Sequence, residues 1–137
     1  MRSNIIYSVV ILISLASLTA CTTKSKDQKA IEQVAYNYLD AMANYRIDEA
    51  EQYASHATVE SSIKLAKFFM TMADSNFVTR NTPGKVEITD CYMSNDSTAV
   101  VKYHKTSPSG ETNDSIWVIK EEGKWMAHFA VKPLSTR

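Results

Sequence analysis

The sequence predicts an α+β fold in which N-terminal helices pack on one face of an antiparallel sheet of about four strands. Apolar residues recur at steps of three and four between residues 26 and 73, which is the spacing of helices with one buried face. After Pro83-Gly84, short segments alternate apolar and polar residues with period two, and turns separate them. Helices followed by sequential strands lie together on one side of a strand meander.

The N-terminus reads as an export signal. Arg2 precedes an apolar run of roughly 14 residues, which is signal-peptide length and shorter than the ~20 residues of a membrane-spanning helix. The run leads into Leu18-Thr19-Ala20-Cys21, which resembles the lipobox of bacterial lipoproteins: an apolar residue and two small residues before a cysteine. The resemblance implies cleavage before Cys21 and lipidation of its sulfur. The alternative is an ordinary cleaved signal with Cys21 present by chance, but no Ala-x-Ala cleavage site occurs at the end of the apolar run.

This interpretation divides the chain into three parts and gives it a location. The ranges are 1–20 for a lipoprotein signal peptide, 21–27 for the lipidated Cys21 and a polar tether, and 28–137 for one folded domain. Two or more acyl chains anchor a protein stably, so the membrane is an expected partner through the lipid. We expect the cell envelope. Thr22 is not the Asp that retains lipoproteins in the inner membrane of enteric bacteria, so the outer membrane, at its periplasmic face or the cell surface, is favoured if the source is Gram-negative.

Composition excludes several classes of function. Removing residues 1–20 from the 137 leaves 117 residues, enough for one domain with a single core. The formal net charge of +0 gives no reason to expect nucleic acid as a partner. The three histidines are far apart and the three glycines are isolated, so no metal and no phosphate-binding cofactor is expected. If Cys21 is lipidated, Cys91 has no disulfide partner; it is either a small buried hydrophobe, which is the commoner case, or a reactive thiol.

Three helices are expected. The first begins after Ser25, which can form a capping box with Gln28, and runs to about Tyr45. A short second helix should begin with Asp48 as its N-cap and end near Ala54, and a third should begin with Thr58 as its N-cap and end near Ala73. The third helix carries an apolar stripe that we expect to be core rather than a binding face. Its members are Val59, Ile63, Ala66, Met70 and Ala73, widened by Leu65, Phe69 and Met72.

Four strands are expected at about 85–93, 98–106, 115–120 and 125–131. Strand faces alternate with period two, so each strand should have an inward and an outward set. The inward sets of the second and fourth strands are Ala99, Val101 and Tyr103, and Trp125, Ala127, Phe129 and Val131. His104 and His128 fall on the outward faces, where they should meet solvent or a partner.

Two features point to a known superfamily. One is the run Ala35-x-x-Tyr38-Leu39-x-Ala41 with Tyr45-Arg46-Ile47-Asp48-Glu49-Ala50 after it, and the other is the hairpin Gly123-Lys124-Trp125. Together they resemble the NTF2-like superfamily, and within it the small cystatin-like bacterial lipoproteins, a domain family of unknown function. The resemblance implies a cone, in which a long helix crosses a curved antiparallel sheet and Trp125 plugs the cone against that helix.

The predicted function is a non-enzymatic binding domain, for a small apolar ligand in the cone or for an envelope protein on the sheet. Aromatic and apolar side chains with a few polar groups suit such a pocket, although the same side chains can simply fill a core. The candidate lining residues are Tyr38, Met42, Tyr103, Trp117, Trp125 and Phe129. The oligomeric state stays open, a dimer included.

Two alternatives stay open as well. The first is an isomerase or dehydratase of the kind known in the NTF2-like superfamily, which needs an acid–base residue and a Tyr inside the cone. The residues of the right types are Asp40, Asp90, His104 and His128 as bases and Tyr36, Tyr38 and Tyr103 as donors. None matches a catalytic motif, so no catalytic residue is assigned. The second alternative is an immunity or inhibitor lipoprotein that blocks a partner through its exposed sheet.

Overall fold

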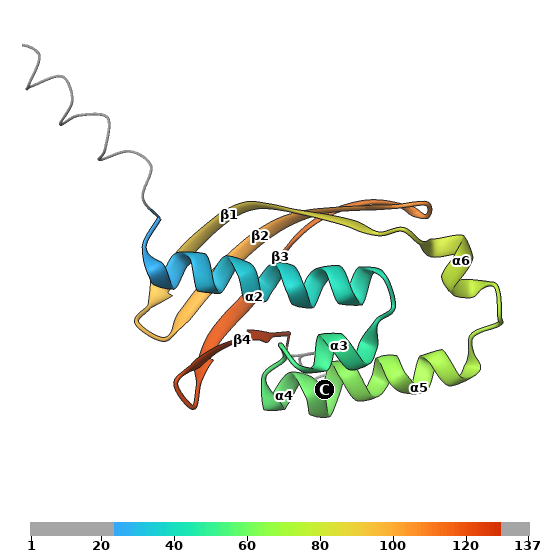
Figure 1. Cartoon of the computed structure of the whole chain (residues 1–137), viewed down its shortest axis with the longest axis horizontal. Helices are drawn as coiled ribbons and strands as arrows, with labels where there is room; N and C mark the ends of the chain where they lie inside the picture. Colours follow the sequence, from blue (N-terminus) through green and yellow to red (C-terminus); the bar gives the residue numbers. More distant parts are fainter. Residues whose placement is uncertain (1–23, 130–137) are drawn as a thin grey trace, which may run out of the picture.

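A computed structural model describes residues 24–129, and the predicted signal peptide, Cys21 and residues 130–137 lie outside this range. Helices cover one face of a curved sheet of four strands, and the strand order β1-β2-β3-β4 follows the chain (Figure 1). This is the arrangement that the sequence predicts, and the fold class is confirmed as α+β, with the helices packed on a curved antiparallel sheet. None of the described helices is long and apolar enough to cross a membrane.

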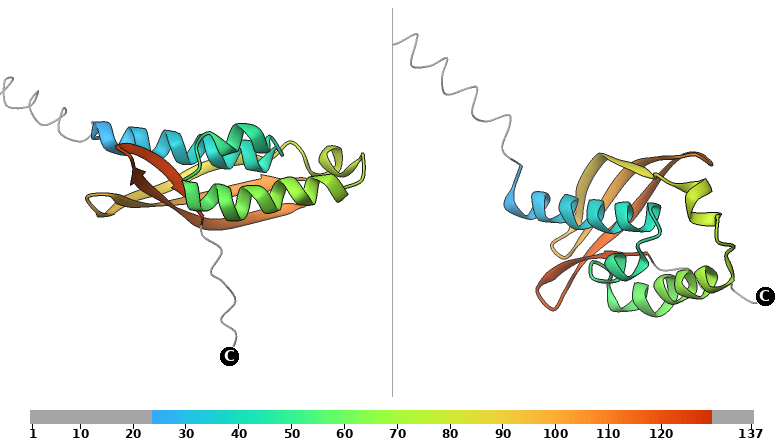
Figure 2. Two further views of the ribbon diagram at one scale, coloured as in Figure 1. Left: turned by 90° about the horizontal axis from the view of Figure 1, so that it is seen from below. Right: turned by 45° about the vertical axis from the view of Figure 1, so that its right-hand side comes forward.

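Helix α2 (Lys26–Ala43) lies across the sheet and supplies the helical side of the core (Figure 2). Its first turn is capped as predicted, because Gln28 N donates to Ser25 Oγ at 3.1 Å. The Gln28 side chain does not complete the box, since it donates to Glu32 instead. The helix ends at Ala43, where the Asn44 side chain donates to the Gly84 carbonyl at 3.0 Å and accepts from the Gly84 amide at 2.9 Å. A side chain at Gly84 would collide with the Ala43 carbonyl, so only glycine permits this approach of β1 to α2.

The short helices after α2 start where the sequence analysis does not place them. Helix α3 (Ile47–Glu51) begins before Asp48, so Asp48 lies in its first turn and does not cap it. Helix α4 (His56–Thr58) is capped by Ser55, whose Oγ accepts from Thr58 N at 3.3 Å. The predicted Thr58 cap is therefore wrong, because the hydroxyl three residues earlier already fills that role and Thr58 bonds elsewhere.

The third predicted helix consists of two elements, and most of its apolar stripe is not buried. The π-helix η1 (Val59–Ile63) precedes α5 (Lys64–Met72), and Ile63 is buried while α5 has no buried residue. Helix α5 runs in the same general direction as α2, on the far side of α3 (Figures 1 and 2). Since no strand covers its outer side, the apolar residues there are exposed: Leu65, Phe68, Phe69 and Met72. The expectation that Leu65, Phe69 and Met72 belong to the core is wrong.

Helix α6 (Phe77–Asn81) is absent from the sequence analysis. It has no hydrophobic repeat because it is one turn long, and a single aromatic cluster holds it. The Phe77 ring makes edge-to-face contacts with Tyr45 and with Phe69, both at 5.2 Å between ring centroids.

The sheet consists of β1 (Lys85–Asn95), β2 (Thr98–Ser107), β3 (Gly110–Glu121) and β4 (Lys124–His128), all antiparallel to their neighbours. A bulge at Thr89 interrupts the pairing of β1 with β2. Strand β3 begins five residues before the predicted Ser115, because the polar residues 110–114 pair with β2 and need no apolar alternation. Beyond β4, Ala54 pairs with Ala127 in a parallel bridge.

The core lies between α2 and the inner face of the sheet. Tyr38 and Leu39 of α2 meet Val101 of β2, Ile116 and Val118 of β3 and Ala127 of β4 in one buried cluster. The predicted inward sets of β2 and β4 are confirmed for Ala99, Val101, Trp125 and Ala127. Trp117 is wrong as an interior residue: it is 49% exposed, because its neighbours Ile116 and Val118 take the inward positions and period two turns Trp117 outward.

Candidate functional site

A small apolar cavity opens at one end of the core. Its volume is about 170 Å³, and side chains from α2, η1, β2 and β3 and from the end of β4 form its walls. The lining residues are Tyr38, Leu39, Met42, Ser62, Tyr103, Ile116 and Phe129. Tyr38, Met42, Tyr103 and Phe129 of the predicted lining set therefore come together, and Trp117 and Trp125 do not line it.

Local structure explains how these side chains converge. Tyr38 and Met42 are four residues apart on α2 and so project from the same side of the helix. Tyr103 pairs with Ile88 of β1 and lies on the inner face of β2. Phe129, 44% exposed, forms the rim. Its amide donates to Thr58 Oγ1 and its carbonyl accepts from Ser62 Oγ, both at 2.9 Å, so the backbone there is fixed on both sides.

Two tyrosines supply the polar groups of this cavity. Tyr38 is only 4% exposed, and burial, followed by the nearby Tyr103, raises the pKa of its phenol to about 12. Burial, and after it the charge of Asp114, also raises the pKa of Tyr103. Both phenols therefore keep their protons at neutral pH and are available as hydrogen-bond donors.

The two tryptophans have other roles. Trp125 is 8% exposed and packs beneath α2, with its Nε1 3.4 Å from Asp27 Oδ1 and the Lys120 ammonium 5.3 Å from the ring centroid. It closes the opposite end of the core, as the resemblance implies. Trp117 lies on the outer face of the sheet between Val100 and His128 in register.

The residues named as acid–base candidates do not line the cavity. Asp40 is paired with Arg46 near the end of α2. His104 Nδ1 is 2.8 Å from Asn113 Oδ1 on the outer face. Asp90 is exposed and accepts from the Cys91 amide. Among the described residues, no carboxylate and no imidazole forms part of the cavity wall.

His128 belongs to a cluster that the sequence analysis does not identify. Its Nδ1 is 2.8 Å from Ser55 Oγ, which is also hydrogen-bonded to Thr58 Oγ1 at 2.9 Å. His128 lies opposite the outward-facing Trp117 in register and is partly exposed, and its bond to Ser55 also ties it to the helical layer, which the sequence does not predict. Ser55 and Thr58 are fully buried, so the pair of Ser55 and His128 holds β4 to α4 and presents no accessible nucleophile. In the sequence, the only indication of this cluster is the pair of hydroxyl residues Ser55 and Thr58, three positions apart at the start of a helix.

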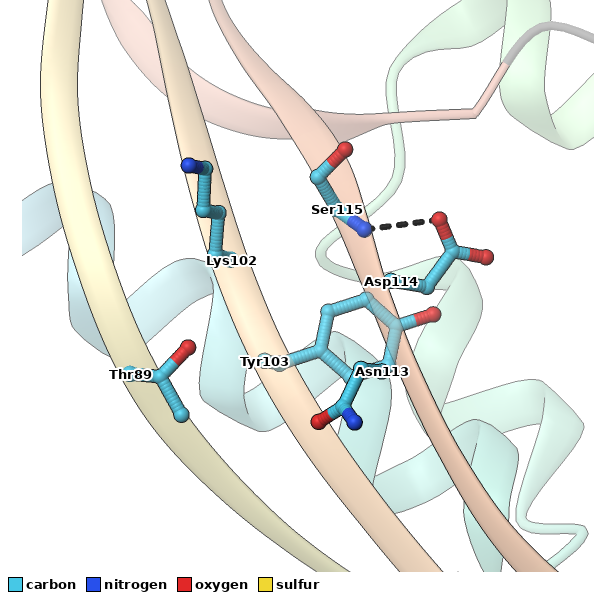
Figure 3. Close-up of a pocket in the computed structure, with 6 residues that line it drawn as sticks. All are labelled: Thr89, Lys102, Tyr103, Asn113, Asp114 and Ser115. Carbon is cyan, nitrogen blue, oxygen red and sulfur yellow. Dashed lines mark hydrogen bonds between the residues drawn. The ribbon is translucent and has the colours of Figure 1, made fainter.

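A second, polar pocket of about 300 Å³ lies on the sheet. Tyr103 stands in its wall between β2 and β3 with Asn113 and Asp114 beside it, and Ser115 N donates to Asp114 Oδ1 at 2.7 Å (Figure 3). The other lining residues are Thr89 and Lys102. Tyr103 therefore separates this open polar pocket from the apolar cavity.

Metal binding and thiol chemistry have no support in the described part of the chain. Residues 24–129 contain no group of three or more His, Cys, Asp or Glu side chains placed to hold an ion. Cys91 is half-buried, and burial, aided by the charges of Glu32 and Asp90, raises the pKa of its thiol. A raised pKa leaves less thiolate, so these surroundings favour the small-hydrophobe interpretation of Cys91.

Comparisons with known proteins give a structural similarity but no family. No protein-family model matches the chain, and no curated protein matches it. Among solved structures, the chain is similar to a Campylobacter jejuni protein described provisionally as an NTF2-like transpeptidase, at 13% sequence identity and a TM-score of 0.48. The match covers 72% of this chain and 96% of that one. At this level of similarity nothing about activity passes from one protein to the other.

Proposed function

We propose that this chain is a membrane-anchored lipoprotein whose domain binds a small apolar ligand and performs no catalysis. The observation that carries the proposal is the apolar cavity itself. Four side chains chosen from the sequence pattern, Tyr38, Met42, Tyr103 and Phe129, line one cavity at the end of the core. Convergent apolar walls with a few polar groups are the usual form of a ligand site.

The size of the cavity limits the ligand. A volume of about 170 Å³ is close to that of the ~150 Å³ engineered apolar cavity that binds benzene. The proposed ligand is therefore one ring with two or three further heavy atoms, or a branched chain of similar volume. A fatty acid or a sterol would extend out of this space into solvent.

The chemistry of the wall argues against the isomerase alternative. Proton transfer needs a carboxylate or imidazole within hydrogen-bond reach of the substrate, and the described walls carry only phenols and one Ser hydroxyl. The immunity or inhibitor alternative has one observation in its favour. Tyr92 and Trp117 are both about half exposed on the sheet, and exposed aromatic residues are typical of protein interfaces.

Ligand binding is tested with ethylbenzene and the soluble domain from residue 22 onward. Addition of ethylbenzene should raise the thermal midpoint, since a ligand that binds only the folded state stabilises it. Ile116→Phe fills the cavity and should abolish the shift. Ile119→Phe places the same substitution at an outward position of the same strand and should leave the shift intact. A shift that survives Ile116→Phe would place the ligand elsewhere and refute the proposal.

The anchor is tested in cells. Cys21→Ala should abolish fatty-acid labelling and release the protein from the membrane fraction, because the sulfur is the acceptor of the lipid. If the Ala variant still labels and still pellets with membranes, the lipobox interpretation fails. The catalytic alternative is tested by following solvent deuterium exchange into the methyl group of acetophenone. Exchange above the buffer rate that disappears with Tyr103→Phe would replace the proposed function by an enzymatic one.

A further inference from the structure

Helix α5 presents an apolar face to solvent. Four large apolar side chains on this helix have exposed fractions between 45% and 64%: Leu65, Phe68, Phe69 and Met72. Single exposed apolar residues are ordinary on a protein surface. Four of them gathered on one short helix form a patch, and such patches are typical of contact surfaces for proteins, ligands or membranes.

The spacing of these side chains makes α5 amphipathic. Residues 65, 68, 69 and 72 follow the steps i, i+3, i+4 and i+7, so they share one side of the helix. The polar residues Lys64, Lys67 and Thr71 follow the steps i, i+3 and i+7 and share a different side. A helix with Leu and Phe on one side and lysines on another is of the kind that lies in the plane of a membrane surface.

The apolar side of α5 is turned away from the domain. Ala66 and Met70, on the opposite side of the helix, pack against the core cluster. Of the four exposed residues, Phe69 has an aromatic contact within the described part of the chain, the edge-to-face contact with Phe77 of α6. In the view from below, α5 lies in front of the rest of the domain (left panel of Figure 2).

The position of the predicted lipid anchor favours a bilayer as the partner of this face. Cys21 lies outside the described residues, but Lys24, the first described residue, follows it by three positions. Three extended residues span at most about 11 Å, so a lipid on Cys21 would hold the start of α2 close to the membrane. Because α5 runs in the same general direction as α2 (Figures 1 and 2), a domain that rests on its side has both helices along the membrane surface.

We propose that the apolar face of α5, formed by Leu65, Phe68, Phe69 and Met72, inserts into the headgroup region of the bilayer that carries the lipid anchor. The helix is then a second membrane contact, which fixes how the domain lies on the membrane. This inference rests on the proposed function, because the lipid on Cys21 is what brings α5 to the bilayer.

Burial of apolar side chains, and not charge, drives this insertion. Lys64 is paired with Glu60 at 2.5 Å, and Lys67 is paired with Asp48 at 3.1 Å and with Glu51. Three carboxylates therefore surround the two ammonium groups, and the helix has no net positive charge to attract anionic lipids. Insertion is expected to the same extent in zwitterionic and in anionic vesicles.

The experiment measures depth in the membrane with spin labels on the full mature lipoprotein. The protein is placed in vesicles of phosphatidylcholine, and separately in vesicles of phosphatidylethanolamine and phosphatidylglycerol. Cys91→Ser removes the other thiol, and Leu65→Cys, Met72→Cys or Thr71→Cys then adds one site for the label. Oxygen is concentrated in the bilayer and a nickel chelate stays in water. Labels at residues 65 and 72 should therefore be relaxed more by oxygen, and the label at residue 71, the matched control on the polar side, more by nickel.

A further variant tests whether the apolar face causes the insertion. Phe68→Ser, added to the protein labelled at residue 65, should shift that label toward the nickel response, because it removes a large apolar side chain from the same face. Thr71→Ser in the same background should leave the response unchanged.

The outcomes separate this inference from the proposed function. Mass spectrometry of the purified protein that finds no acyl groups on Cys21 would refute the anchor and this inference with it. With the acyl groups present, nickel responses at residues 65 and 72 equal to that at residue 71 would overturn the inference and leave the anchor and the cavity standing. A label at residue 65 shielded from both reagents, or broadened by a second label nearby, would show that a protein or a second copy covers the face, and would overturn it as well.

Discussion

Replacement of Trp125 by Ala should be one of the most destabilising single changes in the domain. The ring is 8% exposed and packs beneath α2 at the closed end of the core. A buried tryptophan removes about 150–250 Å² from water, which at about 25 cal/mol per Å² is worth at most roughly 4–6 kcal/mol. Alanine retains part of that burial, and the expected loss is therefore ~3–5 kcal/mol, the range measured for large-to-small changes at aromatic sites.

Hydrogen bonding and charge contribute little to that loss. The contact from Trp125 Nε1 to Asp27 Oδ1 is long at 3.4 Å. The Lys120 ammonium lies over the Trp125 ring, but Lys120 is exposed to solvent. A cation over a ring at an exposed site is worth about 0.5–1 kcal/mol. Cavity formation therefore dominates, and Trp125→Phe should recover most of the lost stability.

The assay is urea denaturation followed by circular dichroism. With an m-value of ~1.5–2 kcal/mol per M for a domain of this size, Trp125→Ala should lower the midpoint by roughly 2 M. The matched control is Trp117→Ala, which removes the same ring from a site that is 49% exposed and should cost about 1 kcal/mol or less. Equal losses for the two variants would refute the burial argument and the assignment of the two faces of β3 and β4.

Three further predictions concern the helical layer and the tyrosines. Ile63→Ala should cost ~2–5 kcal/mol of unfolding free energy, whereas Leu65→Ala, two residues on at an exposed position, should cost under about 0.5 kcal/mol; equal midpoints in urea would contradict the placement of α5. The raised pKa of Tyr38, about 12, means that the folded state holds this proton more tightly than the unfolded state does. The free energy of unfolding should therefore be unaffected below about pH 10 and should fall by on the order of 2 kcal/mol between about pH 10 and 12. Tyr38→Phe should flatten that decline, and an unchanged pH profile in the variant would show that the phenol is not buried. Ser55→Ala should cost ~1–3 kcal/mol and leave two hydrogen-bonding partners unpaired, while Ser61→Ala, at an exposed hydroxyl, serves as the control in the same thermal melt.

Periodicity predicted the fold because most of the core obeys it. The heptad-like steps on α2 placed Tyr38 and Leu39 correctly, and the alternation on β2 and β4 placed Val101 and Ala127. The same rule applied consistently would also have turned Trp117 outward, since it follows the buried Ile116. The position of a residue in the strand alternation therefore predicts its burial better than its large aromatic side chain does.

The helical segment after α3 was predicted less well for a physical reason. An amphipathic stripe reports where a helix can pack, not whether anything packs there, and nothing among the described residues covers Leu65 and Phe68. The cluster around Ser55 was beyond sequence reasoning because it joins residues more than seventy positions apart.

The bridge between Ala54 and Ala127 has a consequence for how this domain meets other chains. The backbone of residues 53–55 lies along the outer edge of β4. There Ser55 N donates to the Ala127 carbonyl at 2.8 Å, and Ala127 N donates to the Tyr53 carbonyl at 2.7 Å. Hydrogen-bonding groups at the margin of a sheet can otherwise recruit a foreign strand. In the described fold, strand addition is therefore left to β1, and the bulge at Thr89 breaks that margin into two short stretches. Neither stretch is long and flat, so the sheet resists edge-to-edge aggregation on both sides.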